Sequence, residues 1–135
     1  LHFKDADIHV EFMLPEMGPA NSGVYIHGNY EVQVFNSYGK EKITQEDAGA
    51  LYGFSKPLVN ACKAPTVWQS YDIDFTAPTF ADGKRVEPAR MSVVHNGIKI
   101  HDKFTLPQDA RKGHFRFQDH GNAVRYRNIW VRKLD

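Results

Sequence analysis

The chain has few of the features that mark disulfide-rich, membrane-spanning or nucleic-acid-binding proteins. Its 135 residues include a single cysteine, Cys62, which excludes an internal disulfide framework and gives no metal-binding spacing. No apolar run approaches the roughly 18 residues of a membrane span, so we expect no transmembrane segment. The formal net charge is +1, and the basic residues are scattered apart from a small C-terminal cluster. Because nucleic-acid binding normally needs a concentrated basic face, we expect no nucleic-acid partner.

The sequence also lacks internal repeats, low-complexity tracts and any helix of convincing length. No signal peptide is visible, and Leu1 opens directly into strand-like sequence, so we expect the true start of the protein to lie upstream. A chain of this length makes one domain, residues 1–135, and can bury roughly two-thirds of the surface that its unfolded form exposes. Between residues 37 and 65 the periodicity fails, and loops this long are usually functional or ordered by a partner.

Alternation of apolar and polar residues dominates the rest of the chain. From residue 8 to residue 14 every second residue is apolar, while His9 and Glu11 take alternate positions. Successive side chains of a strand point to opposite faces, so the pattern indicates a half-buried strand. Gly28-Asn29 and Asn96-Gly97 are hairpin-turn signals. Further strands are expected at residues 24–27, 30–35, 68–76, 90–95, 98–102, 114–118 and 124–134. Many short strands separated by turns predict an all-β fold, an antiparallel two-sheet β-sandwich.

The C-terminal strand joins a histidine-bearing turn to two arginines. His120 lies in the turn sequence Asp-His-Gly-Asn, and Arg125 and Arg127 follow it at period two. Residues at period two share one face of a strand. The opposite face is expected to carry Val124, Tyr126 and Trp130. Guanidinium groups are costly to bury in an apolar core, so the pattern predicts a polar cleft.

The hairpin around Gly28-Asn29 presents a second polar face. Tyr25 and His27 share a face of its first strand, and Glu31 and Gln33 share a face of its second. Sugar recognition needs such planar hydrogen-bonding groups together with aromatic faces. The same pattern also fits the solvated outer face of an ordinary hairpin. We expect the following residues to extend the surface if their strand lies beside it: Gln118, His120, Arg125 and Arg127.

His120 is the candidate proton-transfer group, because histidine gains and loses a proton near neutral pH. Glu31 could orient it, act as its acid–base counterpart or share a cation with it. Against this reading, residues 119–122 are also a good turn sequence, in which a histidine is most often merely exposed. Gln69 is the polar end of an apolar row on the strand that begins at Trp68, a position common where core gives way to cleft.

Four segments together resemble a known family. Residues 21–39, 68–72, 94–102 and 118–134 are similar, in the same order, to the motifs of the 3-keto-disaccharide hydrolase domain. The resemblance runs from about Asp7 to Leu134 and implies a concanavalin-like jelly roll. It also places His101, beside Asp102, near the rim of a cleft.

The resemblance further implies an enzyme that cleaves 3-keto-glycosides. A carbonyl at C3 makes the C2 hydrogen acidic, so a base can remove it, the glycosidic oxygen can leave, and water can add afterwards. In this reading His120 and Glu31 are catalytic. Arg125, Arg127 or a divalent metal ion would stabilise the enolate. The expected substrate-binding residues are Tyr25, His27, Gln33, Gln69, His101, Gln118, Arg125 and Arg127.

Two other functions stay open at this point. A non-catalytic carbohydrate-binding module could use the same jelly roll, because fold alone does not decide function. A structural or protein-interaction sandwich would explain the alternation but leaves the polar face without a purpose. An assay with a 3-keto-disaccharide separates these possibilities.

The resemblance carries two further expectations. It implies a periplasmic or extracellular protein. The opening strands usual in the family, which end in a Gly-Trp element, have no counterpart before Leu1. We therefore expect an unpaired sheet edge near residues 1–12, covered by a second chain in a homo-oligomer or by residues outside this sequence.

Overall fold

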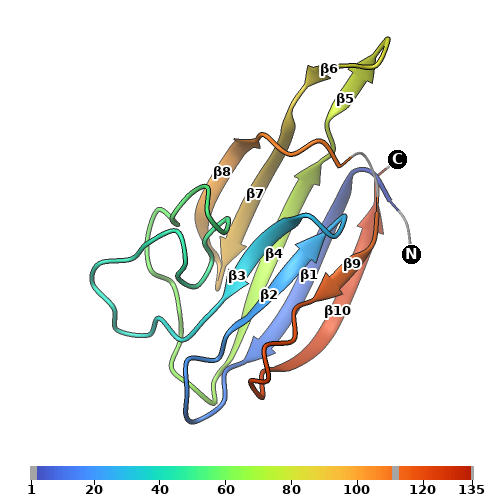
Figure 1. The fold of residues 1–135 in the computed structure, drawn as a ribbon. Helices are drawn as coiled ribbons and strands as arrows, with labels where there is room; N and C mark the ends of the chain where they lie inside the picture. The colour runs from blue at the N-terminus through green and yellow to red at the C-terminus, as the bar shows by residue number, and fades with distance from the viewer. Residues whose placement is uncertain (1–2, 111–112, 135) are drawn as a thin grey trace.

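The computed structural model describes residues 3–110 and 113–134, which form a sandwich of antiparallel sheets (Figure 1). The larger sheet has the strand order β10-β1-β4-β7-β8, and the smaller has the order β3-β2-β9. Strands β5 and β6 form a hairpin that projects from one end. No helix occurs in the described ranges, so the predicted all-β sandwich is confirmed. The strands are β1 (Ala6–Met13), β2 (Ser22–Ile26), β3 (Tyr30–Val34), β4 (Trp68–Thr76), β5 (Thr79–Ala81), β6 (Lys84–Glu87), β7 (Ala89–His95), β8 (Ile98–Leu106), β9 (Phe115–Phe117) and β10 (Arg125–Lys133).

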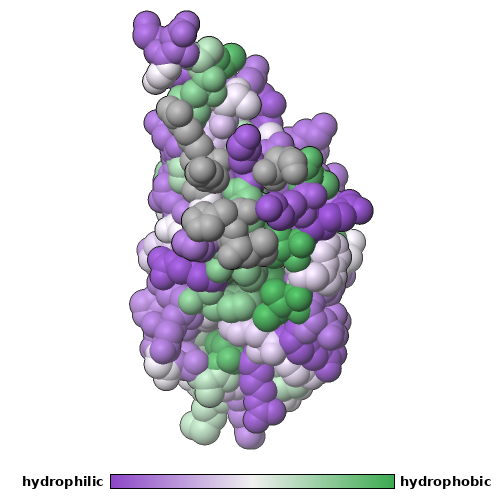
Figure 2. Space-filling view, turned by 90° about the vertical axis from the view of Figure 1, so that its right-hand side faces the viewer, coloured by the Kyte–Doolittle hydropathy of each residue, from purple (hydrophilic) through white to green (hydrophobic). Residues whose placement is uncertain are grey.

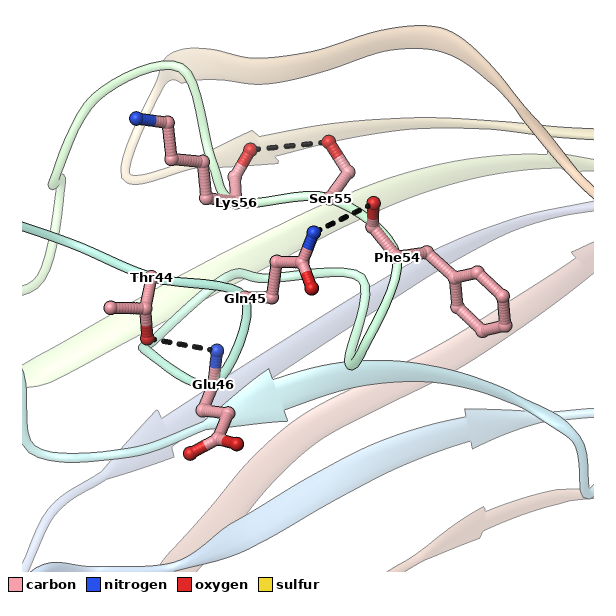
Figure 3. Close-up of a pocket in the computed structure, with 6 residues that line it drawn as sticks. All are labelled: Thr44, Gln45, Glu46, Phe54, Ser55 and Lys56. Carbon is pink, nitrogen blue, oxygen red and sulfur yellow. Dashed lines mark hydrogen bonds between the residues drawn. The ribbon is translucent and has the colours of Figure 1, made fainter.

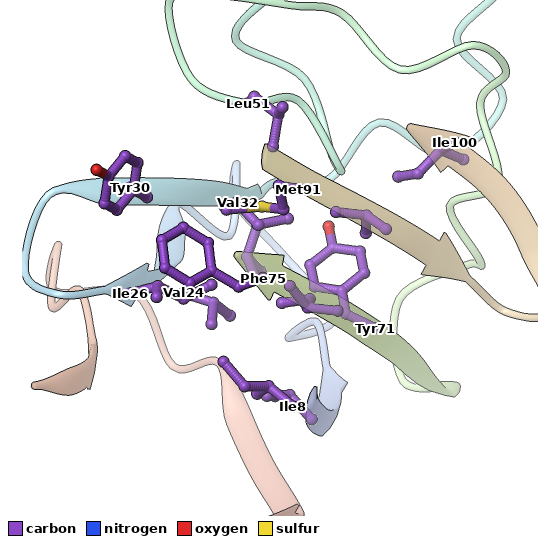
Figure 4. Packing of buried hydrophobic residues seen from close by; sticks show 14 of the residues in the cluster. Ile8, Val24, Ile26, Tyr30, Val32, Leu51, Tyr71, Phe75, Met91 and Ile100 are labelled. Carbon is purple, nitrogen blue, oxygen red and sulfur yellow. The ribbon is translucent and has the colours of Figure 1, made fainter. Parts of the chain in front are cut away.

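The core lies between the inner faces of the two sheets. Ile8 and Phe75 of the larger sheet meet Val24, Ile26 and Tyr30 of the smaller one, and none of the five is more than 1% exposed (Figure 4). Burying a large apolar side chain stabilises the fold by about 1.5–3 kcal/mol. The core therefore fixes the register of each strand and leaves the alternate residues to the two outer faces.

The two open sides of the sandwich are closed differently. Residues 35–67 cover the side between β3 and β8, where Leu51 is 1% exposed. On the opposite side, Figure 2 shows apolar surface between hydrophilic flanks. Inner-face residues of β9 and β10 are only half-buried there: Phe115, Phe117, Tyr126 and Val131. The described core is thus most accessible along β9 and β10.

The long segment also extends the smaller sheet. Leu51 forms a bridge with Val32, and the Tyr52 amide donates to the Glu31 carbonyl at 3.2 Å. Asp47 anchors the segment with its buried carboxylate, which accepts bonds from Ser37, Thr44 and Lys40. Burial alone would raise the pKa of Asp47, but these bonds lower it below its usual value. Residues 49–52 of the segment therefore lie alongside β3 and are hydrogen-bonded to it.

The first hairpin turns one residue earlier than predicted. His27 and Gly28 occupy the left-handed region, with φ of 55° and 67°, and the Asn29 amide donates to the Ile26 carbonyl. The strand consequently ends at Ile26. The predicted turn at Asn96-Gly97 is confirmed, with φ of 53° and 81°.

The expected free edge near residues 1–12 is wrong for the described part of that stretch. Strand β1 pairs with β10 on one side and with β4 on the other. The edge strands of the larger sheet are β10 and β8 instead. In the described ranges, no helix is long and apolar enough to cross a membrane.

Trp130 also departs from the predicted parity. The pairing of β1 with β10 is irregular between His9 and Glu11, and Asn128 in β10 has a φ of 49°. This irregularity shifts the alternation by one residue. Trp130 therefore lies on the same outer face as Arg127 and stacks on the His9 ring at 5.7 Å.

Candidate functional site

A row of four polar or aromatic residues crosses the outer face of the smaller sheet. Tyr25 on β2 lies opposite Glu31 on β3 and opposite Arg116 on β9. Tyr52 extends the row beyond β3, since its amide bonds to the Glu31 carbonyl. Directly opposite residues of antiparallel strands lie close together, so the four side chains are neighbours.

Hydrogen bonds join the centre of this row into a chain. The Tyr25 hydroxyl donates to Glu31 Oε1 at 2.9 Å and accepts a bond from Gln118 Nε2 at 3.2 Å. The Arg116 guanidinium carbon lies 4.5 Å from the centre of the Tyr25 ring. Tyr25, Glu31 and Gln118 were predicted to share a surface, and the structure brings these three together.

Gly23 gives the Glu31 carboxyl its position. Gly23 lies in the next row across the sheet, between Gln33 on β3 and Gln118. The backbone amide of Gln118 donates to the Gly23 carbonyl at 2.9 Å. A Cβ atom added to Gly23 would overlap Glu31 Oε2. The missing side chain at position 23 therefore leaves the space into which Glu31 leans.

The surroundings of Glu31 shift the pKa of its carboxyl group in opposite directions. Burial raises the pKa of Glu31, while the Tyr25 hydrogen bond and the charges of His120 and Arg116 offset part of that rise. Burial and the Glu31 carboxylate raise the pKa of Tyr25 to about 12. Tyr25 is therefore a phenol at neutral pH and can act as a hydrogen-bond donor.

His120 is exposed on the turn between β9 and β10, near enough to act on the charge of Glu31. Gly121, with φ of 73°, lets the chain turn, and its amide donates to Asp119 Oδ1 at 2.8 Å. Asn122 Nδ2 donates to the His120 carbonyl, and Asn122 Oδ1 accepts from the Asn21 amide. The turn is thus held against the start of β2, beside the row.

Arg125 and Arg127 do not join this site. Both lie on the outer face of the larger sheet, because β10 pairs with β1 while β9 pairs with β2. Arg127 donates to Glu11 at 2.9 Å and covers the Trp68 ring at 3.9 Å. Glu31 and Arg127 therefore face away from each other across the sandwich. The predicted single cleft containing both residues is wrong.

His27 and Gln33 also differ from the predicted arrangement. The turn at His27 directs its ring into the core, against Phe3 and Phe75, where both ring nitrogens lie near backbone carbonyls. Gln33 is 2% exposed beneath the long segment and donates to the Glu46 carbonyl at 3.0 Å. Neither side chain lies open on the outer face.

Gln69 and His101 hold the long segment in place. Gln69 accepts bonds from the Lys63 amide at 3.1 Å and from His95 Nε2 at 2.8 Å. His101 donates from Nε2 to the Gly49 carbonyl at 2.7 Å, and burial lowers its pKa. Both residues are buried, so their contacts are those of structural anchors.

Sequence reasoning missed Arg116, Tyr52 and Gly23. Arg116 lies between Phe115 and Phe117, which face the core. Alternation along the strand could therefore have predicted that Arg116 shares the outer face with Gln118. Tyr52 lies in a segment without periodicity, and only the tertiary bridge at Leu51 reveals its neighbour. Among the described residues no three His, Cys, Asp or Glu side chains are grouped to hold a metal ion.

Comparison with solved structures identifies similar folds. The chain aligns over 99% of its length with a structure from Parabacteroides distasonis provisionally described as a glycosyl hydrolase, at 32% identity and a TM-score of 0.87. It spans 66% of that structure's length. Two further structures from the same organism, with the same provisional description, share the fold at 19% and 18% identity, with TM-scores of 0.74 and 0.72. No curated protein matches the sequence.

A family model agrees with these likenesses. It describes a 3-keto-alpha-glucoside-1,2-lyase-like domain, and it matches residues 1–132, which include all ten strands except the last residue of β10. The match contains every member of the row on the smaller sheet. The chain belongs to the family of 3-keto-alpha-glucoside-1,2-lyase-like domains.

Proposed function

We propose that the outer face of the smaller sheet acts on 3-keto-glucosides and breaks their glycosidic bond by elimination. The observation that carries this proposal is the partly desolvated Glu31 carboxyl, hydrogen-bonded to Tyr25 and close to the charges of His120 and Arg116. Titratable groups with shifted pKa values gather at sites of proton transfer. The family match and the glycosyl hydrolase description of the similar structures support a carbohydrate substrate.

The chemistry needs a base, a charge partner and stabilisation of an enolate. His120 takes the proton from C2, and the released electron pair forms the enolate with the C3 carbonyl. The Glu31 carboxylate attracts the imidazolium that results. Arg116, in place of the distant Arg127, is the cation available to the enolate oxygen.

The remaining steps complete the bond change. The enolate re-forms the C3 carbonyl and expels the oxygen at C1, which leaves a double bond between C1 and C2. The leaving oxygen takes a proton from the site or from water. Water then adds to C1 while C2 regains a proton, so the net reaction is hydrolysis. If the unsaturated sugar leaves before water adds, the same site acts as a lyase.

The test is release of sugar from a 3-keto-glucoside and from the same glucoside without the keto group. Only the keto compound should be cleaved, because its C2 hydrogen alone is acidic. In D2O, the wild type should also exchange that hydrogen for deuterium, and His120→Ala should slow exchange and cleavage together. Equal cleavage of both compounds would contradict the elimination mechanism. Binding without exchange or cleavage would favour a carbohydrate-binding module.

A further inference from the structure

We infer that the Tyr25 hydroxyl is the acid of the reaction, which gives its proton to the glycosidic oxygen as that oxygen leaves C1. The inference rests on the proposed function, which leaves the source of this proton open between the site and water. An alkoxide is too strong a base to leave C1 readily without a proton, so a glycoside substrate needs such a donor. Three neighbours of Tyr25 on the sheet suit it to the role: Glu31, Arg116 and Gln118.

Tyr25 lies on the central strand of the smaller sheet, close to the proposed base. It lies opposite Glu31 on one side and opposite Arg116 on the other. Its hydroxyl is bonded to Gln118 Nε2 at 3.2 Å, and Gln118 lies two residues before His120 in the chain. C1 and C2 are adjacent atoms of one sugar ring, so the base for C2 and the acid for the oxygen on C1 must lie close together. The bond through Gln118 brings the Tyr25 hydroxyl to the turn that carries His120.

The surroundings of Tyr25 keep its phenol protonated before the reaction. Burial and the Glu31 carboxylate raise the pKa of Tyr25 to about 12, so the hydroxyl has a proton to give at neutral pH. That hydroxyl donates to Glu31 Oε1 at 2.9 Å, so its hydrogen is directed toward the polar groups of the outer face. An alkoxide is a stronger base than the phenolate of Tyr25. Transfer of the proton to the leaving oxygen is therefore favourable.

Two neighbours stabilise the phenolate that forms when the proton leaves. Gln118 Nε2 donates to the phenol oxygen, and the Arg116 guanidinium carbon lies 4.5 Å from the centre of the Tyr25 ring. The charge of Arg116 also opposes the rise in the pKa of Tyr25. Donors and cations that are already in place where negative charge develops lower the barrier of a reaction step. Tyr25 can therefore act as an acid in the transition state although it is a weak acid at rest.

The proton balance closes within the site. His120 removes the C2 proton, the enolate re-forms the C3 carbonyl, the C1–O bond breaks, and Tyr25 protonates the departing oxygen. When water adds, the Tyr25 phenolate takes a proton from it as its oxygen bonds to C1, and the His120 imidazolium returns a proton to C2. When the unsaturated sugar leaves first, Glu31 carries the imidazolium proton to the phenolate across their 2.9 Å bond. Both routes restore the starting forms of His120 and Tyr25.

The long segment places its own phenol farther from the base. Tyr52 lies beyond β3, on the side of the row away from β9 and the His120 turn. It is 44% exposed, and Gln45 Nε2 donates to the carbonyl of nearby Phe54 at 3.3 Å. Figure 3 shows the side chains around the adjoining hollow pointing apart, with the Phe54 ring directed away from the other five. The side chains of this hollow do not converge on a leaving oxygen, whereas the groups around Tyr25 do.

The experiment compares methyl 3-keto-glucoside with 4-nitrophenyl 3-keto-glucoside. Methoxide needs a proton in order to leave, whereas nitrophenolate is stable without one. Tyr25→Phe should lower kcat for the methyl compound about 10²-fold or more, the usual contribution of a positioned acid, and change kcat for the nitrophenyl compound little. Release of methanol and of nitrophenol measures the two rates. Tyr38→Phe removes the hydroxyl of an exposed tyrosine on the long segment, so it is the matched control and should leave both rates unchanged.

Hydrogen exchange at C2 distinguishes an acid from a residue that only positions Glu31. In D2O, Tyr25→Phe should exchange the C2 hydrogen of the methyl compound as fast as the wild type, because His120 performs that step before the oxygen leaves. Gln118→Leu removes the donor to the phenolate and should show the same selective loss of methyl cleavage to a smaller degree. Thermal melts of the variants check that each is folded.

Three results would overturn the inference. The first is an undiminished cleavage of the methyl compound by Tyr25→Phe. The second is a proportional fall of exchange and cleavage in that variant, which would mean that the phenol only positions Glu31. The third is the selective loss in Tyr52→Phe in place of Tyr25→Phe, which would make Tyr52 the acid. Failure of the wild type to exchange the C2 hydrogen would instead contradict the proposed function, and the assignment of Tyr25 would fall with it.

Discussion

The Glu31 carboxyl lies over Gly23, in space that any other residue at position 23 would fill. Gly23 is a strand residue whose neighbours across the sheet carry glutamine side chains, so the glycine forms a gap in an otherwise occupied row. A glycine inside a strand weakens the strand but permits close approach of another group. Here the approaching group is the carboxyl that hydrogen-bonds to Tyr25.

We predict that Gly23→Ala impairs activity far more than stability. The new Cβ would displace Glu31 Oε2, and a misplacement of about 1 Å near the reacting atoms can cost on the order of 10²-fold in rate. The backbone can accept alanine, because Gly23 has no positive φ. Steady-state kinetics on a 3-keto-glucoside and a thermal melt measure the two effects. Adding Glu31→Asp, which shortens the acid, should recover part of the lost rate; no recovery would argue against this steric relationship.

Arg116→Gln should raise the pKa of the Glu31 carboxyl further above its usual value. The Arg116 charge holds the Glu31 pKa below the level that burial alone would set. Without that charge the carboxylate is less stable relative to the acid, so its pKa rises further and the ionised form is lost at a higher pH. An NMR titration that follows the Glu31 side-chain carboxyl measures this pKa directly. Arg125→Gln, on the other sheet, is the control and should leave the pKa of Glu31 unchanged.

Arg127→Ala should leave turnover of a 3-keto-glucoside unchanged. Arg127 lies on the opposite outer face, where it bonds Glu11 and covers Trp68. Its side chain is 46% exposed, so the loss of stability should be about 1 kcal/mol or less. Kinetics and urea unfolding of the variant check both statements. A fall in turnover at unchanged stability would place Arg127 in the reaction after all.

The sequence was sufficient to predict the architecture, because the alternation of apolar and polar residues along β1 and the turn at Asn96-Gly97 are local properties of the chain. It was also sufficient to bring Tyr25, Glu31 and Gln118 to one face, since their registers follow from short hairpin and neighbour pairings. The sequence failed to place Arg127, because alternation with a period of two residues predicts which residues share a face of a strand. It does not predict to which sheet that strand belongs. It failed for His27 and Trp130 because single residues with positive φ shifted the alternation.

The buried anchors show another limit of the sequence pattern. Gln69 and His101 have the same chemistry as sugar-binding residues, and nothing local distinguishes the two roles. The contacts of the long segment decide between them, since Gln69 bonds the Lys63 amide and His101 bonds the Gly49 carbonyl. A segment without periodicity gives no register from which those contacts could be predicted.

Gln69→Leu should therefore destabilise the protein without a change in the chemistry. The substitution leaves the Lys63 amide without its acceptor and His95 Nε2 without a partner in a buried environment. An unsatisfied buried polar group costs about 1–3 kcal/mol. Chemical denaturation measures the loss, and kcat at a temperature well below the melting point should stay at the wild-type value. A large fall in kcat for folded Gln69→Leu would restore Gln69 to the substrate site.

The His9 network predicts how stability depends on pH. His9 Nδ1 lies 2.6 Å from Asp72 and Nε2 lies 2.9 Å from Glu11, so the protonated ring links β4, through Asp72, to β1. Burial lowers the pKa of His9, but the bonds and charges of the two carboxylates outweigh that effect and raise it above 6.5. A folded-state pKa above the unfolded one means that the native state binds the proton more tightly. The resulting stability is complete below the unfolded pKa and is lost as pH rises through the folded pKa.

Unfolding free energies of the wild type and His9→Asn, measured between about pH 5 and about pH 9, test this sign. The wild type should be the more stable protein at the acidic end, and the difference should shrink toward the basic end. Asp72→Asn removes one carboxylate but keeps the ring, so it should reduce the pH-dependent part of the difference without abolishing it, since Glu11 remains. A difference between wild type and His9→Asn that stays constant across the range would mean that His9 contributes packing against Trp130 and no charge.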